Sequence, residues 1–273
     1  MIKSNKEDTG LPCFDFDCCF ANSKKRAKAP FTEFPGEKVK RLIDFPRTLP
    51  LSSICQLYDQ HVGLVGTGIA IHPYYLITAA HNVYDIKKKS EYMPLIYPGL
   101  HRGNRDLIMP VVPEDIQRHH FFDFEDDQYD IALIRTMSPF DNFYPIKSWW
   151  QLKDELNLPD IHFAVRTSDN FPLYVLGYKA RYRNAGLHWD GGVTVAAVGN
   201  VVGYDCSTVK GMSGGPILSD IRHNGVRNEI IGIHAGGFSA ATDVIPQRSN
   251  KGILFTNKII EWVNGIISGG LHV

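Results

Sequence analysis

Short apolar or alternating segments recur along most of this chain and are separated by Gly, Pro, Asn and Asp. They form two sets: ICQLY (54–58), YYLITAA (74–80) and DIALIRT (130–136), then FPLYVLGYKA (171–180), GVTVAAVGNVVGY (192–204) and EIIGIHAGG (229–237). Many short strands with frequent turn residues are typical of all-β sandwiches and barrels. A parallel sheet would show strands alternating with long helices, and this pattern does not. The sequence therefore predicts an all-β, antiparallel fold.

The two sets of strands also suggest how the chain is divided. With 273 residues it is long enough for two barrel-sized units. We expect a loosely ordered N-terminal extension (1–45), a first β unit (46–145), a linker (146–170) and a second β unit (171–273). The basic run KKRAK in the extension is expected to be solvated chain.

A single helix is predicted near the C-terminus, over TNKIIEWVNGIIS (256–268), with Thr256 as its N-cap. Its apolar face comprises Ile259, Ile260, Val263, Ile266 and Ile267. We expect this face to pack against a barrel, and a membrane-surface role is the alternative.

Composition excludes several classes of function. The 29 basic residues balance the 29 acidic residues, so no overall field favours nucleic acid. No segment approaches the ~20 apolar residues of a membrane span. The first residues, MIKSNKEDTG, are charged where an export signal needs an apolar core, so we expect a cytoplasmic protein or one delivered by a non-classical route, such as an effector or a viral enzyme.

Cysteine usage fits the same expectation. The chain has five cysteines, of which Cys13, Cys18 and Cys19 are clustered, whereas Cys55 and Cys206 stand alone. An odd number without an export signal indicates free thiols in a reducing compartment. Metal binding or lipidation of the N-terminal trio is the alternative. We expect neither a metal site nor a cofactor.

Three segments carry residues that could act together on an amide bond. His81 lies in LITAAHNVYD, Asp130 precedes the apolar run IALI, and Ser213 lies in GMSGGPIL. Each alone has an ordinary structural explanation. Together they supply a nucleophile, a base that takes and returns its proton, and a carboxylate that orients the base. The backbone amides of Gly211 and Ser213 could stabilise the oxyanion.

The motifs TAAH, DIALI and GxSGGP, in this order and 49 and 83 residues apart, resemble those of the trypsin/chymotrypsin-like serine peptidases. The resemblance covers about residues 53–265. It implies two six-stranded antiparallel Greek-key β-barrels, with His81 and Asp130 from the first and Ser213 from the second. It also implies a protein or peptide substrate and serine endopeptidase activity. A weak or inactive protease-like peptide-binding module is the alternative, and the oligomeric state stays open.

Two positions depart from the secreted digestive members of that family. Asn82 stands where they have a disulfide-bonded cysteine after the histidine. Met212 stands where they have an aspartate that pairs with a newly cut N-terminus. We therefore expect activity without removal of the N-terminal extension.

Residues near the nucleophile suggest the substrate preference. A trypsin-like pocket has an aspartate six residues before the serine, but Ser207 stands there, so a Lys or Arg preference is not expected. Thr208 and His234, the latter in IGIHAGG, resemble the glutamyl endopeptidases and viral peptidases that cut after Gln. Hydrogen-bond donors of this kind suit Glu first and Gln second. The alternative for His234 is a buried structural histidine.

The residues after His234 suggest how a substrate backbone is bound. We expect Ala235, Gly236 and Gly237 to offer a strand edge to an extended peptide. Ala235 replaces a serine that often follows at this position, and one orienting bond to Asp130 is expected to be missing.

Overall fold

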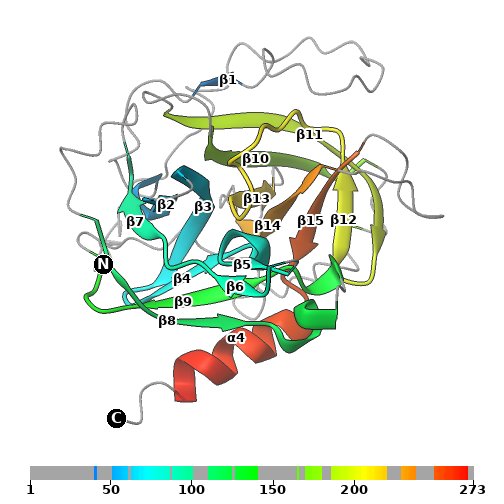
Figure 1. Ribbon diagram of the computed structural model, residues 1–273. Coiled ribbons are helices and arrows are strands. Elements are labelled where there is room, and N and C mark those ends of the chain that lie inside the picture. Colours follow the sequence, from blue (N-terminus) through cyan, green and yellow to red (C-terminus); the bar gives the residue numbers. More distant parts are fainter. Residues whose placement is uncertain are drawn as a thin grey trace, which may run out of the picture.

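The computed structural model describes residues 40–41, 51–60, 63–86, 88–100, 110–124, 127–140, 165, 170–179, 186–219, 229–237 and 249–269. Its strands form two barrels that lie against each other, with one helix below them (Figure 1). The short elements are η1 (Leu51–Ser53), η2 (Ala80–Asn82), β5 (Tyr84–Asp85), β6 (Ser90–Glu91), η4 (His120–Phe124) and η5 (Asp127–Tyr129).

The first barrel is an antiparallel six-stranded sheet in the order β7-β2-β3-β4-β9-β8. Its strands are β2 (Ile54–Asp59), β3 (Gly63–His72), β4 (Tyr75–Thr78), β7 (Leu95–Pro98), β8 (Pro113–Arg118) and β9 (Ala132–Thr136). An antiparallel bridge between Ile96 and Val111 joins the β7 edge to the segment before β8. The two edges of this sheet therefore meet.

The second barrel is a seven-stranded sheet in the order β1-β11-β10-β13-β14-β15-β12, and β11 also pairs with β12. Its strands are β1 (Lys40–Arg41), β10 (Pro172–Tyr178), β11 (Leu187–Val198), β12 (Val201–Tyr204), β13 (Pro216–Ser219), β14 (Ile230–Gly237) and β15 (Asn250–Leu254). The β11–β12 pairing closes six of these strands into a ring, and β1 is added outside it.

The two rings have the same connectivity. In each, the first three strands are neighbours in chain order, and the remaining three return in reverse order from the third strand to the first. This is a Greek-key arrangement, and it closes both sheets without leaving long unpaired edges. The predicted fold class, two antiparallel barrels with a C-terminal helix, is confirmed.

Burial on both faces explains why several strands read as continuous apolar runs. In β4, Leu76 packs inside the first barrel, whereas Ile77 belongs to a core shared by both barrels. In β13, Ile217 packs inside the second barrel and Leu218 belongs to the shared core. Because successive side chains of a strand point to opposite faces, the contact between the barrels buries the outer face as well.

The helix α4 (Asn257–Gly269) forms one residue later than predicted and packs on the shared core. Ile259 and Val263 are buried, and the other predicted apolar positions are partly buried against the same cluster. The Trp262 ring lies 5.1 Å from the His119 ring, so α4 follows the second barrel in sequence but contacts the first (Figure 1). The Thr256 hydroxyl donates to Asn200 Oδ1 at 2.8 Å.

The N-terminal and linker predictions fall largely outside the described residues. Within the predicted extension (1–45) only β1 is described, and it pairs with His188 and Trp189 of β11. Within the predicted linker (146–170) only Val165 and Asn170 are described. The bounds of the extension, linker and two units therefore stay predictions.

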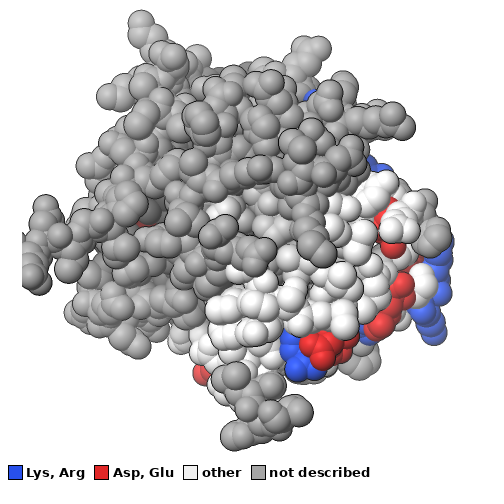
Figure 2. Space-filling view, turned by 90° about the vertical axis from the view of Figure 1, so that its left-hand side faces the viewer, with Lys and Arg blue, Asp and Glu red and all other residues white. Residues whose placement is uncertain are grey.

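The described part of the chain contains two of the five cysteines and part of the charged surface. Cys55 and Cys206 are buried free thiols, whereas Cys13, Cys18 and Cys19 lie outside the described residues. Figure 2 shows described acidic and basic residues close to one another rather than a field of one sign. None of the described helices is long and apolar enough to cross a membrane.

Glu229, just before β14, is a fully buried carboxyl whose oxygens have no hydrogen-bond partner within the described part of the chain. Burial raises its pKa from 4.5 to about 7. The folded protein therefore holds a proton that the unfolded chain has lost, so the free energy of unfolding falls as pH rises from about 4.5 to about 7.

We expect Glu229→Gln to remove this pH dependence, which amounts to about 3 kcal/mol. The measurement is urea unfolding of the wild type and the variant at several pH values between 4 and 8, a range chosen to span both ionisation states. The wild type should lose stability relative to the variant as pH rises. Parallel curves would show that the Glu229 carboxyl is ionised in the folded protein.

Candidate active site

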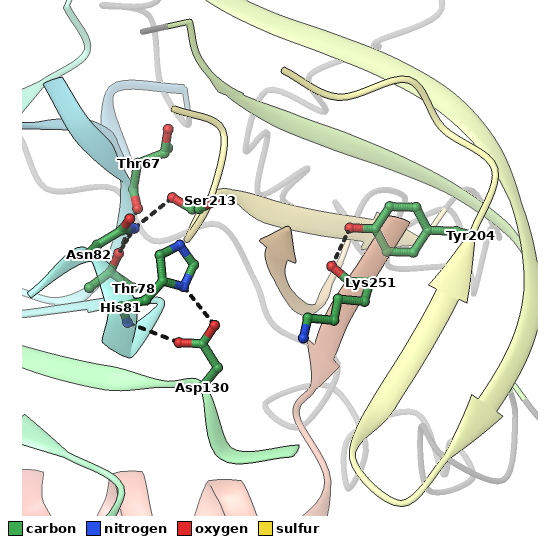
Figure 3. A network of polar contacts seen from close by, with 8 residues as sticks. All are labelled: Thr67, Thr78, His81, Asn82, Asp130, Tyr204, Ser213 and Lys251. Carbon is green, nitrogen blue, oxygen red and sulfur yellow. Dashed lines mark hydrogen bonds and ion pairs between the residues drawn. The ribbon is translucent and has the colours of Figure 1, made fainter. Parts of the chain in front are cut away.

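His81 and Asp130 are brought together by the pairing of their strands in the first barrel. His81 lies in η2, directly after β4, and Asp130 lies just before β9, with which β4 pairs. The His81 Nδ1 is 2.6 Å from Asp130 Oδ2, and the His81 backbone N–H donates to Asp130 Oδ1 at 3.0 Å (Figure 3). The two bonds fix the ring and the carboxylate relative to each other.

The environments of the two side chains differ. The Asp130 side chain is 6% exposed and the His81 side chain 39% exposed. Burial alone would raise the pKa of Asp130, but the charge of His81 and its two hydrogen bonds outweigh burial, and Lys251 adds a smaller attraction, so the pKa lies below its ordinary value. An ionised Asp130 accepts the Nδ1 proton and leaves the other ring nitrogen of His81 to act as a base.

The turn that carries Ser213 requires glycine for geometric reasons. Gly211 has φ +101° and Gly214 has φ +82°, conformations that side chains disfavour. A Cβ on Gly214 would lie 2.1 Å from the Thr67 carbonyl oxygen. Met212 between them is fully buried in the core of the second barrel, which is consistent with its lack of an ion-pairing role.

The backbone of this turn leaves two amide donors unused. The carbonyl of Met212 accepts from the Gly215 N–H at 2.9 Å, and the Gly214 N–H donates to the His234 carbonyl at 2.6 Å. In contrast, the N–H groups of Gly211 and Ser213 donate to no residue of the described chain. The amides predicted to hold an oxyanion are therefore available to do so.

Ser213 and His81 face each other across the junction of the two barrels. In Figure 3 the ring nitrogen of His81 that is remote from Asp130 points towards the turn of Ser213. No hydrogen bond between the Ser213 hydroxyl and His81 is formed in the structure. Such bonds often tighten only in the complex with substrate.

His234 is buried on β14, and its partner is a residue that the sequence motifs did not reveal. The Tyr204 hydroxyl, on β12, lies 2.5 Å from His234 Nδ1. It also lies 3.0 Å from the Lys251 carbonyl oxygen (Figure 3). Burial first, and then the charge of His81, lower the pKa of His234 to about 3. His234 is therefore neutral at physiological pH, and its hydroxyl contact selects which nitrogen carries the proton.

Tyr204 could not be identified from local sequence. Both β12 and β14 pair with β15, so Tyr204 and His234 lie two strands apart in the sheet, 30 residues apart in sequence. A tyrosine in a strand is usually read as a core residue, and only the closed ring brings its hydroxyl to an imidazole.

The other predicted substrate-binding residues are Thr208, which lies before the turn of Ser213, and the three residues that follow His234 on β14. Thr208 is buried and its hydroxyl makes no hydrogen bond within the described chain, to His234 or otherwise. Ala235 is buried, whereas Gly236 is partly exposed. The pairing of β13 with β14 ends at Ile233, so Ala235, Gly236 and Gly237 have no β13 partner along that edge.

The segment before the turn of Ser213 is held by two buried side chains. Asp190, fully buried on β11, accepts from the Ser207 N–H at 2.7 Å. Asn250, on β15, donates to the Cys206 carbonyl. The backbone beside Thr208 is therefore tied to two strands of the second barrel. No cluster of three metal-ligating side chains occurs among the described residues.

A solved structure described as a Glu endopeptidase in complex with MPD is similar to this chain, with a TM-score of 0.62 and 19% sequence identity. The match covers 84% of this chain and 95% of the other. The chain has the chymotrypsin-like double-barrel fold. No protein-family model matches the sequence, and no curated protein matches it significantly. The chymotrypsin-like fold inferred from three short motifs is thus confirmed.

Proposed function

We propose that this chymotrypsin-like chain is a serine endopeptidase with His81, Asp130 and Ser213 as its catalytic triad. The observation that carries the proposal is the His81–Asp130 pair at 2.6 Å beside a nucleophile turn whose two amides are unused. The fold similarity supports the proposal, since both proteins have the same double-barrel architecture.

The mechanism follows from the roles of these groups. The Ser213 hydroxyl attacks the substrate carbonyl while the ring nitrogen of His81 remote from Asp130 takes its proton. The Gly211 and Ser213 amides donate to the developing oxyanion. His81 then gives the proton to the leaving amine, and water hydrolyses the acyl enzyme by the same steps in reverse. Asp130 stays ionised and stabilises the imidazolium.

For specificity, we propose that His234 and Thr208 favour Glu before the cut, with Gln second. A neutral His234 can donate from only one nitrogen. If Tyr204 donates to Nδ1, the far nitrogen carries the proton and donates to a carboxylate. If Tyr204 donates to the Lys251 carbonyl, Nδ1 carries the proton and the far nitrogen accepts from a Gln amide. The Tyr204 hydroxyl has one proton for its two contacts, so the tautomer of His234 decides between a carboxylate and an amide.

For the substrate backbone, we propose pairing with the open edge of Ala235, Gly236 and Gly237. An extended peptide would gain main-chain hydrogen bonds there, close to the turn of Ser213. The alternative function, a protease-like module that binds peptides without cutting them, uses the same edge. Its usual signature is the loss of a triad residue, and all three are present here.

A fluorophosphonate probe tests the proposed function. The Ser213 oxygen should attack the phosphorus and expel fluoride, while His81 takes the serine proton, giving a covalent adduct that peptide mapping locates at residue 213. Prior treatment with the probe should abolish peptide cleavage. A wild-type protein that stays unlabelled, where a known serine peptidase reacts, would contradict the proposal and favour the binding module.

A further inference from the structure

Asn82, the residue after His81, is buried and directed at the nucleophile turn of the other barrel. It is 1% exposed, and its Nδ2 donates to the Ser213 carbonyl at 2.8 Å and to Thr78 Oγ1 at 3.0 Å (Figure 3). A carbonyl only accepts, so the amide nitrogen must face Ser213. Asn82 Oδ1 is buried without a hydrogen-bond partner in the described structure. Because an unpaired buried oxygen destabilises a protein, stability alone does not explain an amide here.

Gly66, on β3, leaves room for this side chain. A Cβ on Gly66 would lie 2.2 Å from Asn82 Nδ2 and 2.4 Å from Asn82 Cγ. The Asn82 carboxamide therefore fills the space that a side chain at position 66 would need. A larger residue at position 66 would displace the amide from Ser213.

Thr67, the next residue of β3, holds the same turn at two points. Its backbone N–H donates to the Ser213 carbonyl at 2.8 Å, and its hydroxyl donates to the Gly211 carbonyl at 2.7 Å. The Thr67 hydroxyl also accepts from the Tyr178 N–H at 2.9 Å. Thr67 and Asn82 thus bind the carbonyls of the two residues whose amides are unused.

The contacts of Thr67 and Asn82 with the turn of Ser213 matter because the two halves of the site belong to different barrels. His81 and Asp130 come from the first barrel and Ser213 from the second. Since peptide units are planar, fixing the carbonyls of Gly211 and Ser213 restricts the rotation of the turn. A small misplacement of reacting groups slows a reaction strongly.

We propose that Asn82 is a positioning residue, whose amide bond to the Ser213 carbonyl, with Thr67, holds the nucleophile turn against the first barrel. The inference rests on the proposed serine-peptidase function. Asn82 touches no reacting atom and acts through Ser213.

The test compares the wild type with Asn82→Leu, which keeps the shape of the side chain and removes the donor. We expect about tenfold slower fluorophosphonate labelling and about tenfold lower kcat for peptide cleavage, with KM unchanged, the size expected from one lost hydrogen bond. Equal labelling rates in the two proteins would overturn the positioning role. An unlabelled wild type would instead overturn the proposed function.

A second variant separates positioning from plain structural support. Gly66→Cys with Asn82→Cys places two thiols close enough to form a disulfide after small shifts. Oxidation should make the double variant more resistant to urea than its reduced form. The oxidised variant should still react with the fluorophosphonate as slowly as Asn82→Leu, because a disulfide has no donor for the Ser213 carbonyl. Full recovery of the labelling rate on oxidation would show that Asn82 only ties β3 to η2.

Discussion

Replacing Ser213 with alanine is expected to lower kcat for peptide cleavage by about 10⁶-fold, the loss typical of removing a triad nucleophile. The reason is that no other hydroxyl lies on the turn between the unused amides of Gly211 and Ser213. Residual turnover should remain above the uncatalysed rate, because the amides still bind the oxyanion. The measurement is steady-state hydrolysis of a Glu-containing peptide, with product identified by mass.

A matched control is Ser138→Ala, which removes an exposed serine of the first barrel. It should cleave at the wild-type rate. If Ser213→Ala kept more than about 1% of the wild-type kcat, the covalent mechanism would be wrong. Unchanged urea unfolding of Ser213→Ala would show that the loss is chemical, since Ser213 is only partly buried.

Replacing His234 with alanine is expected to lower kcat/KM for Glu substrates by about 10²- to 10³-fold, because it removes a buried donor to a charged group. Labelling of Ser213 by the fluorophosphonate should continue, since the probe needs no side chain in that site. Because burial and His81 lower the pKa of His234 to about 3, its removal should leave the acid side of the pH–rate profile above pH 4 unchanged.

Two further variants sharpen this test. Tyr204→Phe removes the hydroxyl that contacts Nδ1 at 2.5 Å, so the preference for Glu over Gln should shrink while cleavage continues. His72→Ala removes a partly buried histidine at the β3–β4 turn. It should change neither the preference for Glu over Gln nor the rate of cleavage. Cleavage by the wild type mainly after Lys, Arg or large apolar residues would rule out the role of His234.

The fold could be predicted from the sequence because its determinants are local. Short apolar runs between turn residues indicate strands, and Gly211 and Gly214 occupy left-handed conformations that glycine readily adopts. The helix was predicted to within one residue because its apolar spacing is independent of what it packs on. That it packs on the first barrel, through Trp262 and His119, could not be read from the same spacing.

The neighbours of these residues were decided by strand register. Sequence predicts His234 as a substrate-binding residue, but its contact with Tyr204 depends on two strands meeting β15 in a particular register. A shift of one residue would turn the Tyr204 hydroxyl to the other face of the sheet. Likewise, Thr208 was predicted in one wall of the substrate pocket and His234 in the other, and the structure buries both side chains.

Asn82 shows most clearly which features follow from the sequence and which depend on the tertiary structure. Sequence alone determined that this position lacks the cysteine of the secreted digestive peptidases, and that His81, Asp130 and Ser213 occur in the same order as in the trypsin/chymotrypsin-like serine peptidases. Only the tertiary structure decided that the Asn82 amide reaches the Ser213 carbonyl, 131 residues away and in the other barrel. Local backbone preferences act between near neighbours in the chain, whereas such a contact exists only once both barrels have closed and packed together.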